Sequence, residues 1–263
     1  MLTHPKLHNT PIDWLNAGDR QTVCYSFFAT IPGMTVLYAT VESSSNNAFL
    51  ISDCQMDSLV TGEPLAGDTI KTLRINSKIA LGFSGSSAHG NPVMAALMEV
   101  SDELSAEDWP NFIKFIEDRG IEKPDLDFTT SCTRISSLIY FLITSRLSQQ
   151  ELRALNLWFV MVGEEDGVLR YCDWRRERNF EAWDYKPSRD DRTVFHIHTN
   201  PIPTADGQFY QDVEHISRDS RLTPIQRAGE LLERTWLRDH SKATRHGHIR
   251  QLRNGFRLEQ VGN

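Results

Sequence analysis

Apolar and polar residues follow two alternating patterns along this chain. Short apolar runs bounded by turn residues predict strands, and apolar residues three to four positions apart predict helices. Strands are expected at 35–41, 48–52, 72–75, 79–85, 157–163, 168–174, 192–199, 247–253 and 256–261. Helices are expected at about 88–104, 109–118, 129–147 and 224–239. This order of strands, helices, strands, helix and strands predicts a layered α+β domain.

Three segments add detail to that pattern. The run 22–31 is ambiguous, because Pro32 and Gly33 follow and interrupt it. The helix candidate 129–147 is so rich in Ile and Leu that little polar face remains, which predicts a helix sandwiched between two layers. The helix at 224–239 begins with favourable capping chemistry, since a threonine, a proline and a glutamine stand at the positions that prefer them.

The composition is that of an ordinary soluble globular protein, with 40% hydrophobic and 24% charged residues. The four cysteines are scattered without a disulfide-like framework, which suits a reducing cytosol. The N-terminus has no secretory pattern and no apolar run approaches membrane-spanning length. The net charge of −7 argues against a nucleic-acid-binding protein. We therefore expect a cytoplasmic protein with neither nucleic acid nor membrane as a partner.

Two features of the chain suggest binding chemistry but have ordinary interpretations. The C-terminal segment is rich in arginine, and we expect a solvated helix end followed by an edge strand, with a docking patch for an acidic partner as the alternative. The pairs His196/His198 and His246/His248 each point to one face of a strand, so zinc is conceivable. No carboxylate or cysteine spacing completes such a site. We expect no metal and no cofactor.

The stretch "IKTLRINSKIALGFSGSS" (70–87) resembles the segment of proteasome subunits in which a lysine opens a hairpin and a glycine ends it. "WFVMVGEEDGVLRYCDW" (158–174) is similar to the central hairpin of that family, and "LTPIQRAGELLERTWLRDHS" (222–241) is similar to its late helix. The resemblance implies an N-terminal-nucleophile (Ntn) hydrolase fold, an α+β sandwich of two antiparallel sheets flanked by helices. Residues 34–263 would form this domain, and residues 1–33 would be an extension or propeptide-like segment.

The family's chemistry, carried over, assigns a role to each matching residue. Thr35 would be the nucleophile, and its own α-amine, with a pKa of about 8 once the chain begins there, would be the base. Lys71 would supply an ammonium group, with Asp53 as its carboxylate partner. The Gly85 amide would donate to the oxyanion, and Asp239 would support the threonine amine.

Several positions depart from the family pattern. Met34 stands where active subunits have glycine, so a rival register places Met34 in the nucleophile position, whereas the small Ala39 favours Thr35. Ser241 comes one position early after the Arg-Asp pair. Thr199 stands where the family has a Gly-Ser-Gly motif and would take the place of its serine. The spacing from Thr35 to Asp53 is slightly longer than in the family, which a longer Ser/Asn turn would absorb.

Each site candidate also has an ordinary interpretation. Thr35 can be a strand threonine, Lys71 a surface lysine and Asp53 a turn residue. Gly85 can be a glycine that eases the turn from a strand into a helix.

Two functions from different classes follow. The first is a threonine-type hydrolase that cuts peptide or amide bonds in a homo-oligomer or ring, after removal of Met34 exposes Thr35. The alternative is a non-catalytic proteasome-like subunit that acts as an oligomeric scaffold or binding module.

Overall fold

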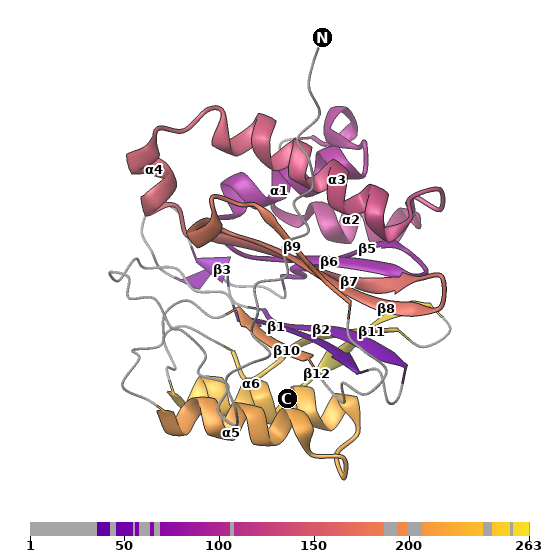
Figure 1. Ribbon diagram of the computed structural model, residues 1–263, viewed down its shortest axis with the longest axis vertical. Coiled ribbons are helices and arrows are strands. Elements are labelled where there is room, and N and C mark those ends of the chain that lie inside the picture. The colour runs from indigo at the N-terminus through magenta and orange to yellow at the C-terminus, as the bar shows by residue number, and fades with distance from the viewer. Residues whose placement is uncertain are drawn as a thin grey trace, which may run out of the picture.

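The computed structural model describes residues 36–42, 46–54, 56–57, 64–65, 69–105, 108–186, 194–198, 207–238, 244–252 and 255–262. Within them, two five-stranded antiparallel sheets lie face to face, and a layer of helices covers the outer face of each (Figure 1). The expected layered α+β sandwich of two antiparallel sheets is therefore confirmed. The expected boundary at residue 34 and the ambiguous run 22–31 lie outside the described residues, so both stay predictions.

The first sheet joins distant parts of the chain in the order β10-β1-β2-β11-β12. Its central hairpin is the expected one, since β1 pairs with β2 and Leu37 lies opposite Ser52. The strands are β1 (Leu37–Glu42), β2 (Asn47–Asp53), β10 (Val194–His198), β11 (Gly247–Leu252) and β12 (Phe256–Val261).

The second sheet follows chain order, β5-β6-β7-β8-β9. Its two expected hairpins, β5–β6 and β7–β8, are both present. Strand β9 did not stand out from the sequence because it is short and three of its four residues are exposed. The strands are β5 (Thr72–Asn76), β6 (Ile79–Gly85), β7 (Leu157–Glu165), β8 (Val168–Arg175) and β9 (Ala182–Tyr185), and β3 (Met56–Asp57) with β4 (Pro64–Leu65) forms a separate small hairpin.

Four helices cover the second sheet and two cover the first (Figure 1). The expected helix 88–104 ends early, at Leu97, and Glu99 then adopts a left-handed conformation with φ of 58°. Helix α5 was not expected from the sequence. The helices are α1 (Ser87–Leu97), α2 (Phe112–Arg119), α3 (Phe128–Ile139), α4 (Gln149–Ala154), α5 (Gly207–Arg218) and α6 (Pro224–Arg238), with short 3-10 segments at Ser101–Glu103, Trp109–Asn111 and Arg176–Arg178.

Three apolar cores hold these four layers together. One lies between the two sheets, one between the second sheet and α1–α4, and one between the first sheet and α5–α6. Leu50, Val160 and Phe256, for example, meet between the sheets. Each fully buried side chain of this size contributes about 1.5–3 kcal/mol to folding.

Helix α3 corrects one expectation. The segment 129–147 was expected to be sandwiched between layers, but it lies in the outer helix layer (Figure 1). It continues from α3 into a π-helix at Tyr140–Thr144, where Tyr140 is 58% and Phe141 63% exposed. Only one stripe of the segment is fully buried, at Ser131, Ile135, Ile139 and Ile143, because the other faces carry exposed or half-buried polar residues and these aromatic residues.

The expected start of α6 is confirmed in detail. The Thr223 amide donates to Gln226 Oε1 at 2.9 Å, and the Gln226 amide donates to Thr223 Oγ1 at 3.3 Å. This reciprocal pair satisfies two amides that the helix itself leaves without partners.

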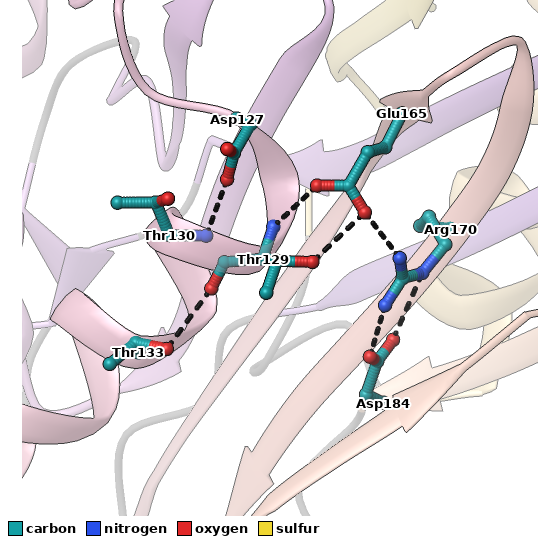
Figure 2. A network of polar contacts seen from close by, with 7 residues as sticks. All are labelled: Asp127, Thr129, Thr130, Thr133, Glu165, Arg170 and Asp184. Atoms are coloured by element: carbon teal, nitrogen blue, oxygen red, sulfur yellow. Dashed lines mark hydrogen bonds and ion pairs between the residues drawn. The ribbon is translucent and has the colours of Figure 1, made fainter.

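A polar network fastens α3 to the β7–β8 hairpin (Figure 2). Asp127 caps the helix by accepting from a backbone amide three residues later, and Glu165 accepts from both the amide and the hydroxyl of Thr129. Arg170 then joins Glu165 to Asp184 on β9. This network lies at the end of the second sheet that carries the β7–β8 turn, opposite the end at which β5 begins.

The arginine-rich C-terminal segment only partly follows expectation. Arg257 is exposed on β12, the expected edge strand of the first sheet. Arg250 on β11, however, is only 1% exposed. The expectation of a solvated segment is wrong at this residue, because its guanidinium group is held by Thr72 of the second sheet and by Glu117 of α2.

Candidate functional site

The antiparallel pairing brings several strand ends together at one end of the sandwich. In the first sheet, β1 begins where β2 ends, and Gly247 at the start of β11 pairs with Asp53. In the second sheet, β5 begins beside the end of β6, and Gly85 pairs with Leu157 at the start of β7. Residues far apart in the sequence therefore meet at strand ends.

Lys71 and Asp53 form a buried ion pair that joins the two sheets. Lys71 Nζ lies 2.7 Å from Asp53 Oδ1, and the two side chains are 5% and 0% exposed. Lys71 directly precedes β5, and Asp53 is the last residue of β2. The ordinary interpretations of Lys71 as a surface lysine and of Asp53 as a turn residue are therefore wrong.

The same carboxylate also holds the start of β1. The Val36 amide donates to Asp53 Oδ1 at 3.1 Å, and the Asp53 amide donates to the Val36 carbonyl at 3.3 Å. The expected pairing of Lys71 with Asp53, beside the Thr35 nucleophile, is thus confirmed for Lys71 and Asp53. Thr35, which precedes Val36 in the chain, lies outside the described residues, and its part of that expectation stays a prediction.

Gly85 must be glycine for conformational reasons alone. Its φ is +103°, a region that other residues rarely adopt, and a Cβ built there would lie 2.0 Å from the Asn156 carbonyl oxygen. Ser86 then leads directly into α1. The ordinary interpretation of Gly85, a glycine that eases the turn into a helix, therefore explains the residue without any catalytic role. Its role as an oxyanion donor stays a prediction.

The remaining assigned residues, Asp239 and Ser241, follow the last described residue of α6, Arg238, and lie outside the described part of the chain. Met34 and Thr199 lie outside it too. The catalytic roles of all six assigned residues stay predictions.

Two neighbours of Asp53, Gly247 and Cys54, were not among the site residues expected from the sequence. Gly247 lies opposite Asp53 on β11, and a Cβ there would lie 2.1 Å from the Ser52 carbonyl oxygen, so only glycine lets the strands approach. Cys54 Sγ lies 3.4 Å from His248 Nδ1, and both residues are buried. The contact between Cys54 and His248 follows only from the fold, since the two residues are 194 positions apart in sequence.

A serine and a histidine lie just beyond Gly85. Ser86 Oγ is 2.9 Å from His89 Nδ1 at the start of α1. Burial of the half-buried His89 lowers its pKa from the ordinary value of 6.5, which favours the neutral imidazole at pH 7.

Neither a metal cluster nor a bilayer-crossing helix is present in the part of the chain that the structure describes. No three His, Cys, Asp or Glu side chains are grouped there so as to hold an ion. No described helix combines the length and the apolar character needed to cross a membrane.

Chemically, the Lys71–Asp53 pair offers a buried cation with an adjacent carboxylate. An ammonium group held in a dry environment stabilises negative charge that develops on a neighbouring atom. The Asp53 carboxylate binds that ammonium group and also accepts from the amide of Val36, the residue before β1. Such an arrangement can stabilise negative charge that develops near the start of β1.

Comparisons with known proteins add little. No family model and no curated protein matches the chain. Among solved structures, eukaryotic HslV from Trypanosoma brucei is similar over 87% of this chain and 99% of its own, at 14% identity and a TM-score of 0.45. Because the identity and the TM-score are this low, this likeness assigns no function to the chain.

Proposed function

We propose that this protein is an Ntn hydrolase of the threonine type, in which Thr35 acts on peptide or amide bonds once it is the first residue of the chain. One observation carries the proposal. The buried Lys71–Asp53 pair lies where β1 begins, and the Val36 amide is bonded to the same carboxylate oxygen. Thr35 is joined to Val36 by one peptide bond, so the proposed nucleophile is tethered to this pair.

The proposed reaction begins with the free α-amine of Thr35. The amine takes the proton of the Thr35 hydroxyl, and the oxygen attacks the carbonyl carbon of the substrate. Lys71 favours the developing alkoxide, and Asp53 keeps Lys71 in place. The Gly85 amide is assigned to the oxyanion of the tetrahedral intermediate.

Collapse of that intermediate breaks the carbon–nitrogen bond. The protonated α-amine returns its proton to the leaving amine, and an acyl group stays as an ester on Thr35. Water, deprotonated by the same amine, then attacks the ester. The bond between the acyl carbon and Thr35 Oγ breaks, the acid leaves, and the protonated amine returns the proton to Oγ. Asp239 and Ser241 are assigned to holding the amine during both steps, and self-association of several copies is part of the proposal.

The experiment compares the full chain with a form that begins at Met34, from which the cell removes the initiator methionine because threonine is small. In the full chain the Thr35 nitrogen is an amide and has no usable basicity. The described residues of the three apolar cores run from Val36 onward, and the shorter form keeps every one of them. We expect the short form to cleave fluorogenic peptides and the full chain to be inactive.

Two matched variants of the short form complete the test. Thr35→Ala removes the hydroxyl and should abolish cleavage, whereas Thr35→Ser keeps a hydroxyl and an α-amine and should retain part of it. Intact mass shows in every case where the chain begins. If the folded short form starting at Thr35 is no more active than Thr35→Ala on a broad peptide panel, the hydrolase proposal is wrong and the non-catalytic scaffold is the remaining function.

A further inference from the structure

The strand that follows Lys71 is an edge strand, which leaves half of its backbone without a strand neighbour. Strand β5 pairs with β6 alone in the described sheet. The Phe83 amide of β6 donates to the Lys71 carbonyl at 3.4 Å, so the backbone of Lys71 faces β6. Since successive carbonyls of a strand point in opposite directions, the carbonyl of Thr72 points away from β6.

Arg250 occupies the place of the missing neighbour. Its Nη2 donates to the Thr72 carbonyl at 2.7 Å, and its Nε donates to Thr72 Oγ1 at 3.3 Å. Arg250 comes from β11 of the other sheet, the same strand whose Gly247 pairs with Asp53. One strand therefore contacts Asp53 through its backbone and Thr72, the residue after Lys71, through a side chain.

A carboxylate from the helix layer, that of Glu117, balances the charge of Arg250. Its Nη2 also lies 3.1 Å from Glu117 Oε1 on α2. Burial lowers the pKa of Arg250, and the nearby Glu117 carboxylate opposes that shift. An arginine that is 1% exposed is unfavourable unless such partners hold it. Hydrogen bonds from a charged donor are also stronger than neutral ones.

We infer that Arg250 is a positioning residue for Lys71, because it anchors the outward carbonyl of Thr72 and thereby keeps the Lys71 ammonium group on Asp53. The inference about position stands on these contacts alone. Its consequence for catalysis rests on the proposed function.

The test measures the position of Lys71 directly in the full chain. N-acetoxysuccinimide acylates lysine amines only when they are free and accessible, and peptide mass spectrometry reads the rate at each lysine. Lys71 should react slowly, because it is buried and paired. In Arg250→Met we expect Lys71 to react about tenfold faster or more, since its local opening becomes easier. Lys114, which is 67% exposed, should react at the same rate in both proteins.

Arg227→Met is the matched control for general destabilisation. Arg227 is also a buried arginine with a carboxylate partner, Glu42, but it lies on α6, and its guanidinium group donates to Glu42 and to the Ser217 carbonyl. In this variant Lys71 should be acylated as slowly as in the wild type. Equal acceleration of Lys71 by Arg227→Met and Arg250→Met, or an unchanged Lys71 rate in folded Arg250→Met, would show that Arg250 does not position Lys71.

A graded series keeps the inference testable if Arg250→Met does not fold. Glu117→Gln keeps the hydrogen-bond acceptor but removes the balancing charge, so Lys71 should react about two- to fivefold faster. Arg250→Lys keeps the positive charge and at least one hydrogen-bond donor. The acylation rate of Lys71 in this variant should therefore lie between the rates in the wild type and in Arg250→Met. A wild-type rate for Lys71 in folded Glu117→Gln and Arg250→Lys would overturn the inference.

Activity separates the two proposals. In the form that begins at Thr35, Arg250→Met should lower kcat and leave KM nearly unchanged, because Arg250 touches no substrate. If that form is inactive, the proposed function fails, whereas the labelling of Lys71 still decides whether Arg250 positions it.

Discussion

Removing one member of the Lys71–Asp53 pair should destabilise the whole fold, because the pair joins two sheets in a nearly water-free place. At a separation of 2.7 Å, the attraction between the two charges is about 6 kcal/mol with an effective dielectric constant of about 20. Lys71→Met leaves the Asp53 carboxylate buried with its amide donor but without its cation. We expect a loss of about 3–5 kcal/mol in the free energy of unfolding.

The double variant distinguishes an interaction between the charges from simple loss of a side chain. Asp53→Asn keeps an oxygen that can accept from the Val36 amide, but it leaves the ammonium group of Lys71 unpaired. Asp53→Asn combined with Lys71→Met removes both charges, so it should be less destabilised than the sum of the single variants. We expect a coupling energy of about 3 kcal/mol or more.

Urea unfolding of the full chain, followed by tryptophan fluorescence and circular dichroism, measures these energies. Lys114→Met is the control, since Lys114 is 67% exposed and pairs with Asp118 on the surface, where such pairs contribute at most about 1 kcal/mol. A coupling energy below about 0.5 kcal/mol, or a Lys71→Met variant as stable as Lys114→Met, would refute the reasoning that this pair is a buried, mutually dependent unit.

Two other predictions concern the region around Gly85. Gly85→Ala should cost about 3 kcal/mol or more in unfolding free energy, because its φ is +103° and the Cβ would meet a carbonyl oxygen, whereas Gly167→Ala, at φ +75° with nothing within 4 Å, should cost only about 1 kcal/mol by the same urea assay. Equal losses would contradict the steric argument. Because burial lowers the pKa of His89, the unfolded chain binds its proton more readily, so His89 contributes stability above pH 6.5 that is lost as the pH falls through the lowered pKa. His89→Gln should flatten this part of the pH–stability curve, and an NMR titration of His89 with a midpoint at or above 6.5 would contradict the expected direction.

The layered fold could be predicted because its elements carry strong local patterns. The hairpins β5–β6 and β7–β8 are short apolar runs separated by turn residues, and the cap at Thr223 is a local motif, so both follow from neighbouring residues. The extent of α3 burial was predicted wrongly, because apolar content does not reveal which side of a helix meets the sheet. Tyr140 and Phe141 add apolar residues to the segment although they face solvent.

The site was predictable only where a spacing pattern marked it. Lys71 and Asp53 were found through their resemblance to a known family, and the fold then brings them within 2.7 Å. Arg250 was assigned to solvent because arginine on a C-terminal strand is ordinarily exposed. Its burial depends on an outward carbonyl of β5, which is 178 positions away in sequence. No local pattern carries that information, since it arises from the packing of one sheet on the other.

The chemistry of the Lys71–Asp53 pair favours a functional interpretation over a purely structural one. Apolar side chains usually stabilise the contact between two sheets at least as well as a buried ion pair, because the free-energy cost of desolvating two ions offsets much of their attraction. The surroundings supply such side chains, because the core between the sheets is made of leucine, valine, alanine and aromatic residues. A buried cation beside the first residues of β1 is therefore poorly explained by stability alone. It is better explained if charge develops there during a reaction, which is the condition that cleavage by Thr35 would supply.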